Sequence, residues 1–194
     1  ILKAAVLPDL YYITPEASEI GGDLVAWLEQ HLPAYSFLCL RAKELNIDEY
    51  LILAQQVADL CQQRQAQLII HQHYPLLAQL PSAKGVHLTS QQLAQYQSRQ
   101  QLALNPEQYL WVSAHNSQEL EQAWRLGADA ATLSPVCATA SHPNQQAMGW
   151  QKFKEIVKTA KLPVYALGGM TKKEVSLAQQ YGGQGVAGIR GLFA

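Results

Sequence analysis

The stretch Val164-Tyr165-Ala166-Leu167-Gly168-Gly169-Met170-Thr171 is the strongest pointer to the fold. It predicts a strand that ends in two glycines and runs into a helix capped by Thr171. Glycines let backbone amides approach an anion, and a helix N-terminus carries partial positive charge. A second strand-like run, Ala130–Leu133, precedes the polar segment Ser134–Pro143. Two such ends, late in a chain of alternating strands and helices, are where a (β/α)8 barrel usually keeps its phosphate site.

Further strand-like runs recur along the chain at fairly even spacing. Most are short and apolar rather than alternating, which is typical of parallel strands covered on both faces. Helical patterns are predicted at Asp23–Leu32, Asp48–Gln63, Trp150–Thr159, Lys172–Tyr181 and after an N-cap at Ser117. The pattern is weaker in the Gln-rich stretch Gln91–Gln101, and it does not place a helix there. The eight predicted strands are Leu10–Thr14, Phe37–Ala42, Leu68–Gln72, Gly85–Leu88, Tyr109–Ala114, Ala130–Ser134, Val164–Gly168 and Gly185–Ile189.

This order of elements predicts an α/β fold, a (β/α)8 TIM barrel with a closed parallel sheet, formed by residues 1–194 as one domain. The sequence stops at Ala194, just after the eighth strand, so the last helix is predicted to be short or missing. A gap left there in the outer ring would favour a homodimer or another covering partner.

Composition narrows the class of protein. The chain has 194 residues, a net charge of −1, 48% hydrophobic and 15% charged residues. This balance gives no general attraction to nucleic acid or an anionic membrane, and no apolar run approaches the ~20 residues of a membrane span. Three cysteines without a CxxC motif indicate reduced thiols and a cytoplasmic protein.

Polar side chains follow the predicted strands, where such barrels keep their active sites. Arg41 and Lys43 alternate along the second strand, so both can point the same way and bind a phosphate or diphosphate; the alternative is a pair of surface cations. His71 and His73 would share a face if the third strand continues, but a metal needs a further ligand. No metal site is predicted there.

At this point the motifs resemble those of a known family. The order and spacing of eight segments resemble those of the thiamine phosphate synthase/TenI family, and the resemblance covers essentially the whole chain. The segments are 10–14, 39–43, 85–88, 113–115, 127–129, 134–139, 166–170 and 185–187. The resemblance implies a (β/α)8 barrel. The synthases of this family join hydroxymethylpyrimidine diphosphate to thiazole phosphate and release diphosphate with Mg²⁺.

The resemblance also implies roles for individual residues. Arg41 and Lys43 match the basic pair that holds the diphosphate, and Ser113 matches a serine that precedes the family's histidine. The implied catalytic residues are Arg41, Lys43, Ser113 and His142, and the implied substrate-binding residues are His71, Thr139, Ser141, Gly168, Gly169, Gly188 and Arg190.

Several positions depart from the family pattern. Gln72 and Gln92 replace the carboxylates that bind magnesium, His142 replaces a lysine, and Arg190 replaces a serine. Mg²⁺ prefers charged oxygens, so amides alone would bind it poorly. The TenI branch places a catalytic histidine where this chain has Pro135.

Three functions stay open on the sequence. The first is a thiamine phosphate synthase-like transferase with a degenerate magnesium site. The second is a non-catalytic or regulatory barrel that binds a phosphorylated thiazole or thiamine ligand. The third is a metal-free, TenI-like isomerase that uses His71, His115 or His142 as acid and base. The start at Ile1 fits a trimmed chain or the C-terminal domain of a fusion to a MutT-type Nudix hydrolase.

Overall fold

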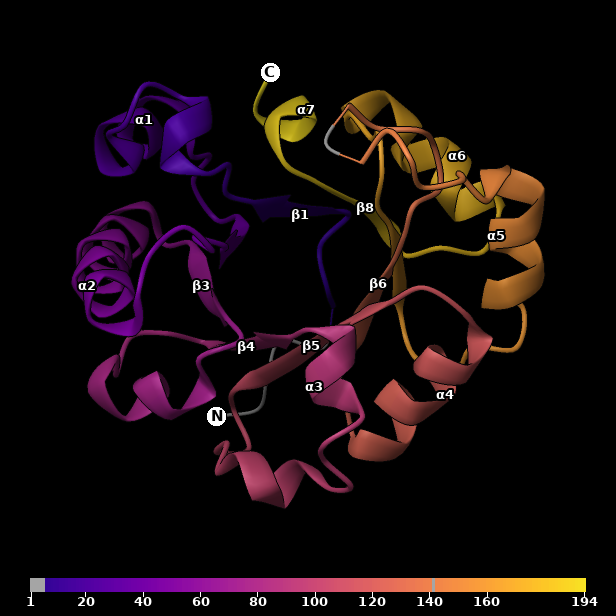
Figure 1. Cartoon of the computed structure of the whole chain (residues 1–194), viewed down its shortest axis with the longest axis horizontal. Coiled ribbons are helices and arrows are strands. Elements are labelled where there is room, and N and C mark those ends of the chain that lie inside the picture. Colours follow the sequence, from indigo (N-terminus) through magenta and orange to yellow (C-terminus); the bar gives the residue numbers. More distant parts are fainter. Residues whose placement is uncertain (1–5, 141) are drawn as a thin grey trace.

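The computed structural model describes residues 6–140 and 142–194. Its strands pair in parallel, each with the next in sequence, and β8 pairs back to β1, so the sheet is a closed barrel (Figure 1). The predicted fold class is therefore confirmed. The strands are β1 (Leu10–Ile13), β2 (Phe37–Leu40), β3 (Gln67–His71), β4 (Gly85–Leu88), β5 (Tyr109–Ala114), β6 (Ala130–Leu133), β7 (Val164–Ala166) and β8 (Gly185–Gly188).

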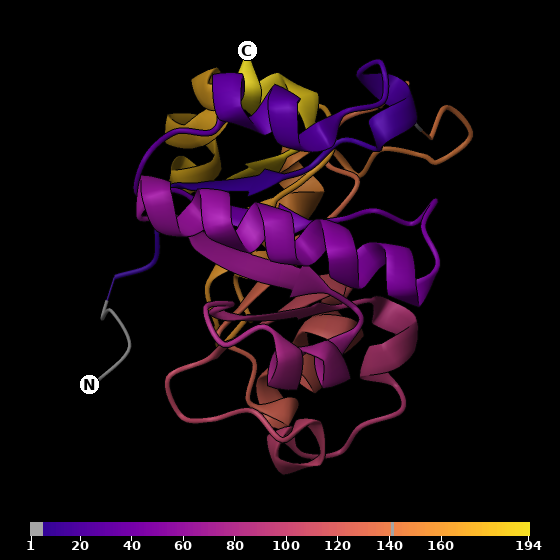
Figure 2. The same cartoon turned by 90° about the vertical axis from the view of Figure 1, so that its left-hand side faces the viewer.

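Helices form a ring around the barrel (Figures 1 and 2). The longest, α2, runs beside β3 and against α1. The α-helices are α1 (Leu24–His31), α2 (Ile47–Arg64), α3 (Ser90–Leu93), α4 (Ser117–Leu126), α5 (Gly149–Val157), α6 (Val175–Gln180) and α7 (Arg190–Phe193). The 3-10 helices are η1 (Ala17–Glu19), η2 (Tyr74–Gln79), η3 (Arg99–Leu102) and η4 (Lys172–Glu174).

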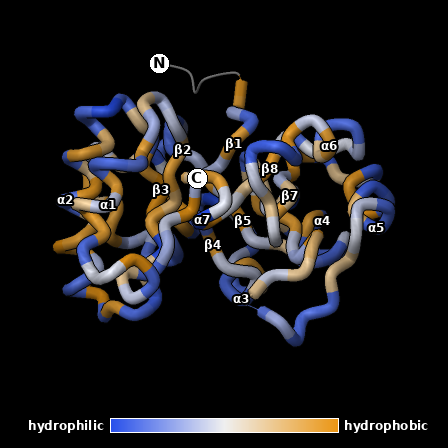
Figure 3. The backbone as a smooth tube through the Cα atoms, turned by 90° about the horizontal axis from the view of Figure 1, so that it is seen from above, coloured by the Kyte–Doolittle hydropathy of each residue, from blue (hydrophilic) through white to orange (hydrophobic). Residues whose placement is uncertain are grey.

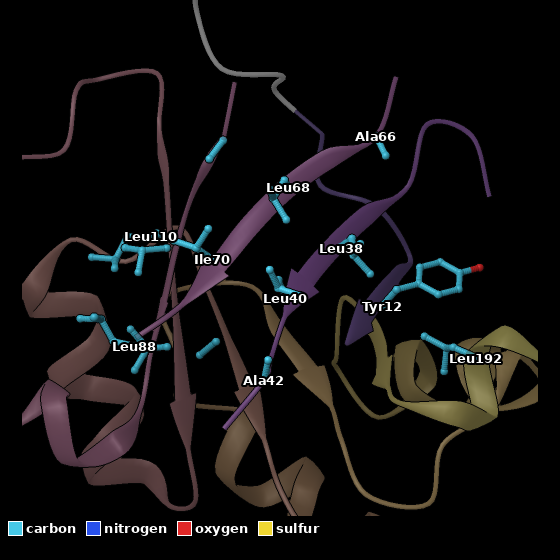
Figure 4. Close-up of a cluster of buried hydrophobic side chains, with 14 of the residues drawn as sticks. Tyr12, Leu38, Leu40, Ala42, Ala66, Leu68, Ile70, Leu88, Leu110 and Leu192 are labelled. Carbon is cyan, nitrogen blue, oxygen red and sulfur yellow. The ribbon is translucent and has the colours of Figure 1, made fainter. Parts of the chain in front are cut away.

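The strands carry two separate apolar cores because successive side chains point to opposite faces. One core lies between barrel and helices; Leu38 and Leu40 of β2 and Leu68 and Ile70 of β3 belong to it (Figure 4). The other core fills the barrel with Tyr11, Phe37, Ile69, Trp111, Tyr165 and their neighbours. Because large rings fill the barrel interior, a site within the barrel is expected at the end where the strands finish, which is called the open end below.

The last helix is short, as predicted. Helix α7 has four residues and occupies the place between α1 and α6 in the outer ring (Figure 1). Leu192 is fully buried, and the ring of Phe193 packs against Tyr12 and Trp27. This single turn therefore covers part of β1 and β8.

Several local predictions of bounds and caps were wrong. Strand β3 ends at His71, because Gln72 has a left-handed φ of 57°. The N-cap of α4 is Asn116 rather than Ser117; its side chain accepts the Glu119 amide. The predicted helix Lys172–Tyr181 is divided into η4 and α6. The segment 91–101, whose helix the sequence pattern does not place, contains most of α3 and part of η3.

Polar connections lie mainly on the outside of the molecule, as the blue stretches of the tube in Figure 3 show. Within residues 6–140 and 142–194, no helix has both the length and the apolar character needed to cross a bilayer.

Candidate functional site

The basic pair lies just beyond β2, at the open end of the barrel. Thr14 anchors it: its hydroxyl donates to the Arg41 carbonyl at 3.0 Å and accepts the Arg41 amide at 2.9 Å. The carboxylate of Glu16 accepts from Arg41 Nη1 at 3.3 Å and from the Lys43 amide at 2.9 Å. Partial desolvation and the nearby Arg41 charge lower the pKa of Lys43. Arg41 and Lys43 thus lie together, although both are beyond the end of the strand that was expected to carry them.

His71 lies at the end of β3 beside this pair. It is 6% exposed. Burial, then neighbouring His87 and the charges of Lys43 and Arg41, lower its pKa to about 2. Its imidazole is therefore neutral at physiological pH. His73 does not share its face: the turn at Gln72 redirects the chain, and the His73 ring packs on Tyr50 instead.

A buried polar network continues from His71 into the barrel. The rings of His71 and His87 are 5.7 Å apart. His87 Nδ1 is 2.9 Å from the Tyr11 hydroxyl, and His87 Nε2 is 2.8 Å from Ser113 Oγ. Burial lowers the pKa of His87 to about 3 and raises that of Tyr11 well above 10. Both groups are therefore uncharged over the working range of an enzyme.

The two glycines after β7 have a packing role. Gly168 and Gly169 have φ values of 109° and 66°, a region that disfavours other residues. A Cβ at Gly168 would lie 3.0 Å from Pro135 Cα and Val136 N, and one at Gly169 would lie 3.1 Å from Cys137 Cβ. The Val136 and Cys137 amides donate to the carbonyls of Leu167 and Gly168. The segment after β6 thus packs directly on the glycines.

The helix N-terminus after these glycines already holds a carboxylate. Glu174 accepts from both the amide and the hydroxyl of Thr171 at 2.6 Å. The Thr171 hydroxyl bond, above all, lowers the pKa of Glu174. This capping box places a carboxylate at the start of η4 and satisfies the amide of Thr171. The neighbouring Gly169 is exposed.

The other candidate residues lie around the ends of β6 and β8. Gly188 is buried against Leu192, and Arg190 begins α7, with Nη2 3.9 Å from Glu19 Oε1. Thr139 and His142 belong to one exposed turn, in which Thr139 accepts the His142 amide. Ser141 lies outside the described residues. Electrostatic interactions, ring contacts and hydrogen bonds connect Arg41, Lys43, His71, His87 and Ser113. Within residues 6–140 and 142–194, no hydrogen bond or ion pair connects this group with His142.

The comparisons with known proteins agree over nearly the whole chain. The family model described as thiamine monophosphate synthase matches residues 10–192. The chain belongs to this family. A protein of Aquifex aeolicus that carries a provisional thiamine-phosphate synthase name is 34% identical over 184 residues, 94% of this chain and 96% of that protein.

One further relative supports the family assignment, and one solved structure supports the fold. The thiamine-phosphate synthase of Fusobacterium nucleatum is 26% identical over 186 residues, 95% of this chain and 89% of that protein. The solved thiamine phosphate pyrophosphorylase of Pyrococcus furiosus has a TM-score of 0.72 and 20% identity, and covers 93% of this chain and 85% of that one. At this identity the second comparison supports the fold alone.

The thiamine monophosphate synthase family is expected to use Mg²⁺, and its ligand positions can be tested here. Gln92 Oε1 accepts the Thr89 amide at 3.1 Å, and Gln92 Nε2 donates to the Gln72 carbonyl at 2.9 Å. The side-chain amide of Gln92 is therefore engaged at both ends. No group of three or more His, Cys, Asp or Glu residues suited to a metal occurs in the described part of the chain. The donor set does not fit a resident Mg²⁺.

Two residues of this site, Glu16 and Tyr11, escape the sequence argument. Glu16 lies in the loop after β1, and only the fold brings it to Arg41. Tyr11 occupies a strand that the apolar pattern assigns to the core. The available signal was a polar residue, His87, at an inward position of a buried strand, which requires a hydrogen-bonding partner.

Proposed function

We propose that this chain is a thiamine-phosphate synthase-type transferase. It would join a hydroxymethylpyrimidine diphosphate to a thiazole phosphate and release diphosphate. One observation carries the proposal: Arg41 and Lys43 lie together at the open end of the barrel, beside the neutral His71. Membership of the thiamine monophosphate synthase family and the names of the relatives support a transferase of thiamine biosynthesis.

The cationic pair suits a departing diphosphate. As the bond between the pyrimidine methylene and the diphosphate breaks, negative charge grows on the leaving group. Fixed cations aimed at that charge stabilise the transition state more than the ground state. Arg41 supplies a planar donor pair and Lys43 a point charge. Glu16 holds the Arg41 guanidinium in place before the substrate arrives.

The second substrate would bind across the barrel mouth. Its phosphate would meet the exposed backbone at Gly169 and the first turn of α7, near Gly188 and Arg190. Thr139, Ser141 and His142 would contribute from the segment after β6. The thiazole nitrogen then attacks the pyrimidine methylene, and positioning of the two rings supplies much of the rate.

Magnesium has a reduced role in this proposal. The amides of Gln72 and Gln92 give no charged ligand, so diphosphate would be held by Arg41 and Lys43 rather than by a protein-bound metal. The affinity for diphosphate should therefore change less than about threefold when about 5 mM Mg²⁺ is replaced by EDTA. The double variant Gln72→Asp/Gln92→Asp should acquire a dependence on Mg²⁺.

A second candidate is a barrel that binds these ligands without turnover. The bond between Gln92 and Gln72 favours it, because it replaces a charged metal site by a neutral contact. A metal-free isomerase receives less support. With a pKa near 2, His71 is poorly matched to acid–base chemistry at neutral pH.

One experiment separates these functions. The chain is titrated calorimetrically with thiazole phosphate, thiamine phosphate and inorganic diphosphate, with Mg²⁺ or EDTA, and is assayed for product from both phosphorylated precursors. Product formation supports the transferase. Binding without product under any divalent metal supports the second candidate, and absence of binding rejects both.

The cellular setting is also part of the proposal. The three cysteines are free, and Cys39 and Cys61 are buried, which suits a reducing cytoplasm. Cell fractionation with a tagged full-length protein tests this location. A homodimer or a fused partner domain stays a prediction, which sedimentation of the full-length protein would test.

A further inference from the structure

The Tyr11–His87–Ser113 network has two possible directions of hydrogen bonding. Either the Tyr11 hydroxyl donates to His87 Nδ1 and His87 Nε2–H donates to Ser113, or every donor is reversed. The imidazole is neutral, so it carries one proton and must donate at one nitrogen and accept at the other. The direction decides whether the Ser113 hydrogen points back to His87 or is free for a ligand.

The surroundings of Tyr11 favour the first direction. Its hydroxyl is fully buried and keeps its proton, because burial raises its pKa well above 10. In the reversed direction this proton would need another acceptor, and the neighbouring group is the thiol of Cys39. Sulfur is a weak acceptor, whereas an imidazole nitrogen is a strong one. Leaving a buried hydroxyl poorly paired costs about 1–3 kcal/mol.

We propose that Tyr11 fixes the Nε2–H tautomer of His87, and that His87 thereby directs the Ser113 hydroxyl hydrogen toward the leaving diphosphate. This inference rests on the proposed function for the identity of the ligand. Among the described residues, His87 is the hydrogen-bonding partner of the half-buried Ser113 hydroxyl. Tyr11 and His87 act as positioning residues, and Ser113 makes the contact with the substrate.

The packing around Tyr11 holds this arrangement rigid. Its ring stacks on Trp111 with centroids 3.8 Å apart and on His87 at 5.7 Å. The change Tyr11→Phe therefore removes one oxygen and keeps the stacked ring. Thr132 supplies the matched control. It is fully buried and pairs with Ser113 in the neighbouring strand β6, but it does not belong to the network.

The tautomer can be observed without any ligand. The protein is labelled with ¹⁵N-histidine and studied by NMR at about pH 7, and the His87 ring resonances are assigned by their loss in His87→Gln. They should show a protonated Nε2 and an unprotonated Nδ1. In Tyr11→Phe the preference for the Nε2–H tautomer should be lost. A protonated Nδ1 in the wild type would overturn the inference, whatever reaction the protein performs.

A double-mutant cycle tests the consequence for the ligand. Ser113→Ala should lower kcat by about tenfold or more, and Tyr11→Phe by about three- to tenfold, with little change in KM. Tyr11→Phe should have no further effect in the Ser113→Ala background, and Thr132→Val should match the wild type. Additive losses would reject the coupling. If the wild type forms no product, the proposed function fails by itself, and the same cycle is measured as affinity for inorganic diphosphate.

Discussion

At the scale of single residues, the cationic pair is the feature most open to test. Arg41→Ala should weaken the binding of inorganic diphosphate by about 1.5–3 kcal/mol, the usual effect of losing a charge-assisted hydrogen bond. Isothermal titration measures the change. Arg125→Ala is the matched control, because Arg125 is an exposed arginine on α4 that pairs with Glu121. Equal affinities for the Arg41 and Arg125 variants would remove Arg41 from the site.

Thr132 gives a second residue-scale prediction. Its hydroxyl is fully buried and has no hydrogen-bonding partner among residues 6–140 and 142–194. Thr132→Val keeps the shape and removes the unpaired group, so the free energy of unfolding should stay level or rise by about 1 kcal/mol. Urea unfolding monitored by circular dichroism measures it.

The control for Thr132 is a threonine whose hydroxyl is paired. Thr171→Val removes the cap of η4, and the free energy of unfolding should fall by about 0.5–2 kcal/mol. A marked loss of stability in Thr132→Val would mean that its hydroxyl has a partner after all.

At the scale of elements, the segment between β6 and α5 packs on the glycines after β7. Two glycine variants can separate the energetic cost of the backbone angle from the cost of a steric clash with this segment. Gly168 and Gly22 have nearly the same φ, 109° and 112°. Of these two, a Cβ added at Gly168 would have neighbours within 4 Å, and a Cβ added at Gly22 would have none. Gly22→Ala should therefore cost about 1–2 kcal/mol for the backbone alone. Gly168→Ala should cost about 1–3 kcal/mol more, because Pro135 and Val136 must move. Chemical denaturation of both variants gives the difference, and equal costs would contradict the packing.

The elements also show what the sequence can predict. Apolar runs locate every strand to within two residues at either end, since burial on both faces leaves a local signal. The local pattern misses the turn at Gln72, because a non-glycine residue in the left-handed region is held by tertiary bonds: its amide donates to the His87 carbonyl. The same limit applies to Glu16, whose partners are 25 and 27 residues away.

At the scale of the whole molecule, two buried histidines couple stability to pH. The pKa values of His71 and His87 are lowered from 6.5 to about 2 and about 3 in the folded protein. Between pH 6.5 and 3 the unfolded chain therefore binds more protons than the folded one, and stability falls as the pH falls. Each histidine contributes up to about 1.4 kcal/mol per pH unit.

Urea unfolding from pH 8 to pH 4 checks this coupling. Below pH 6.5, the free energy of unfolding should depend less steeply on pH in His87→Gln than in the wild type. Above pH 7.5 the two curves should run parallel, because both histidines are neutral in the folded and unfolded states. Parallel curves at all pH values would mean that His87 titrates normally in the folded protein.

The pairing of β1 with β8 has a consequence for how the chain folds. Tyr11 lies next to Ala187 in the closed sheet, yet the two are separated by most of the sequence. Bringing such distant segments together is entropically costly and slow compared with local contacts. Until that step is complete, the growing sheet has two open edges whose unpaired amides and carbonyls can bind other unfinished chains. Ring closure is therefore the step at which refolding should depend most strongly on protein concentration.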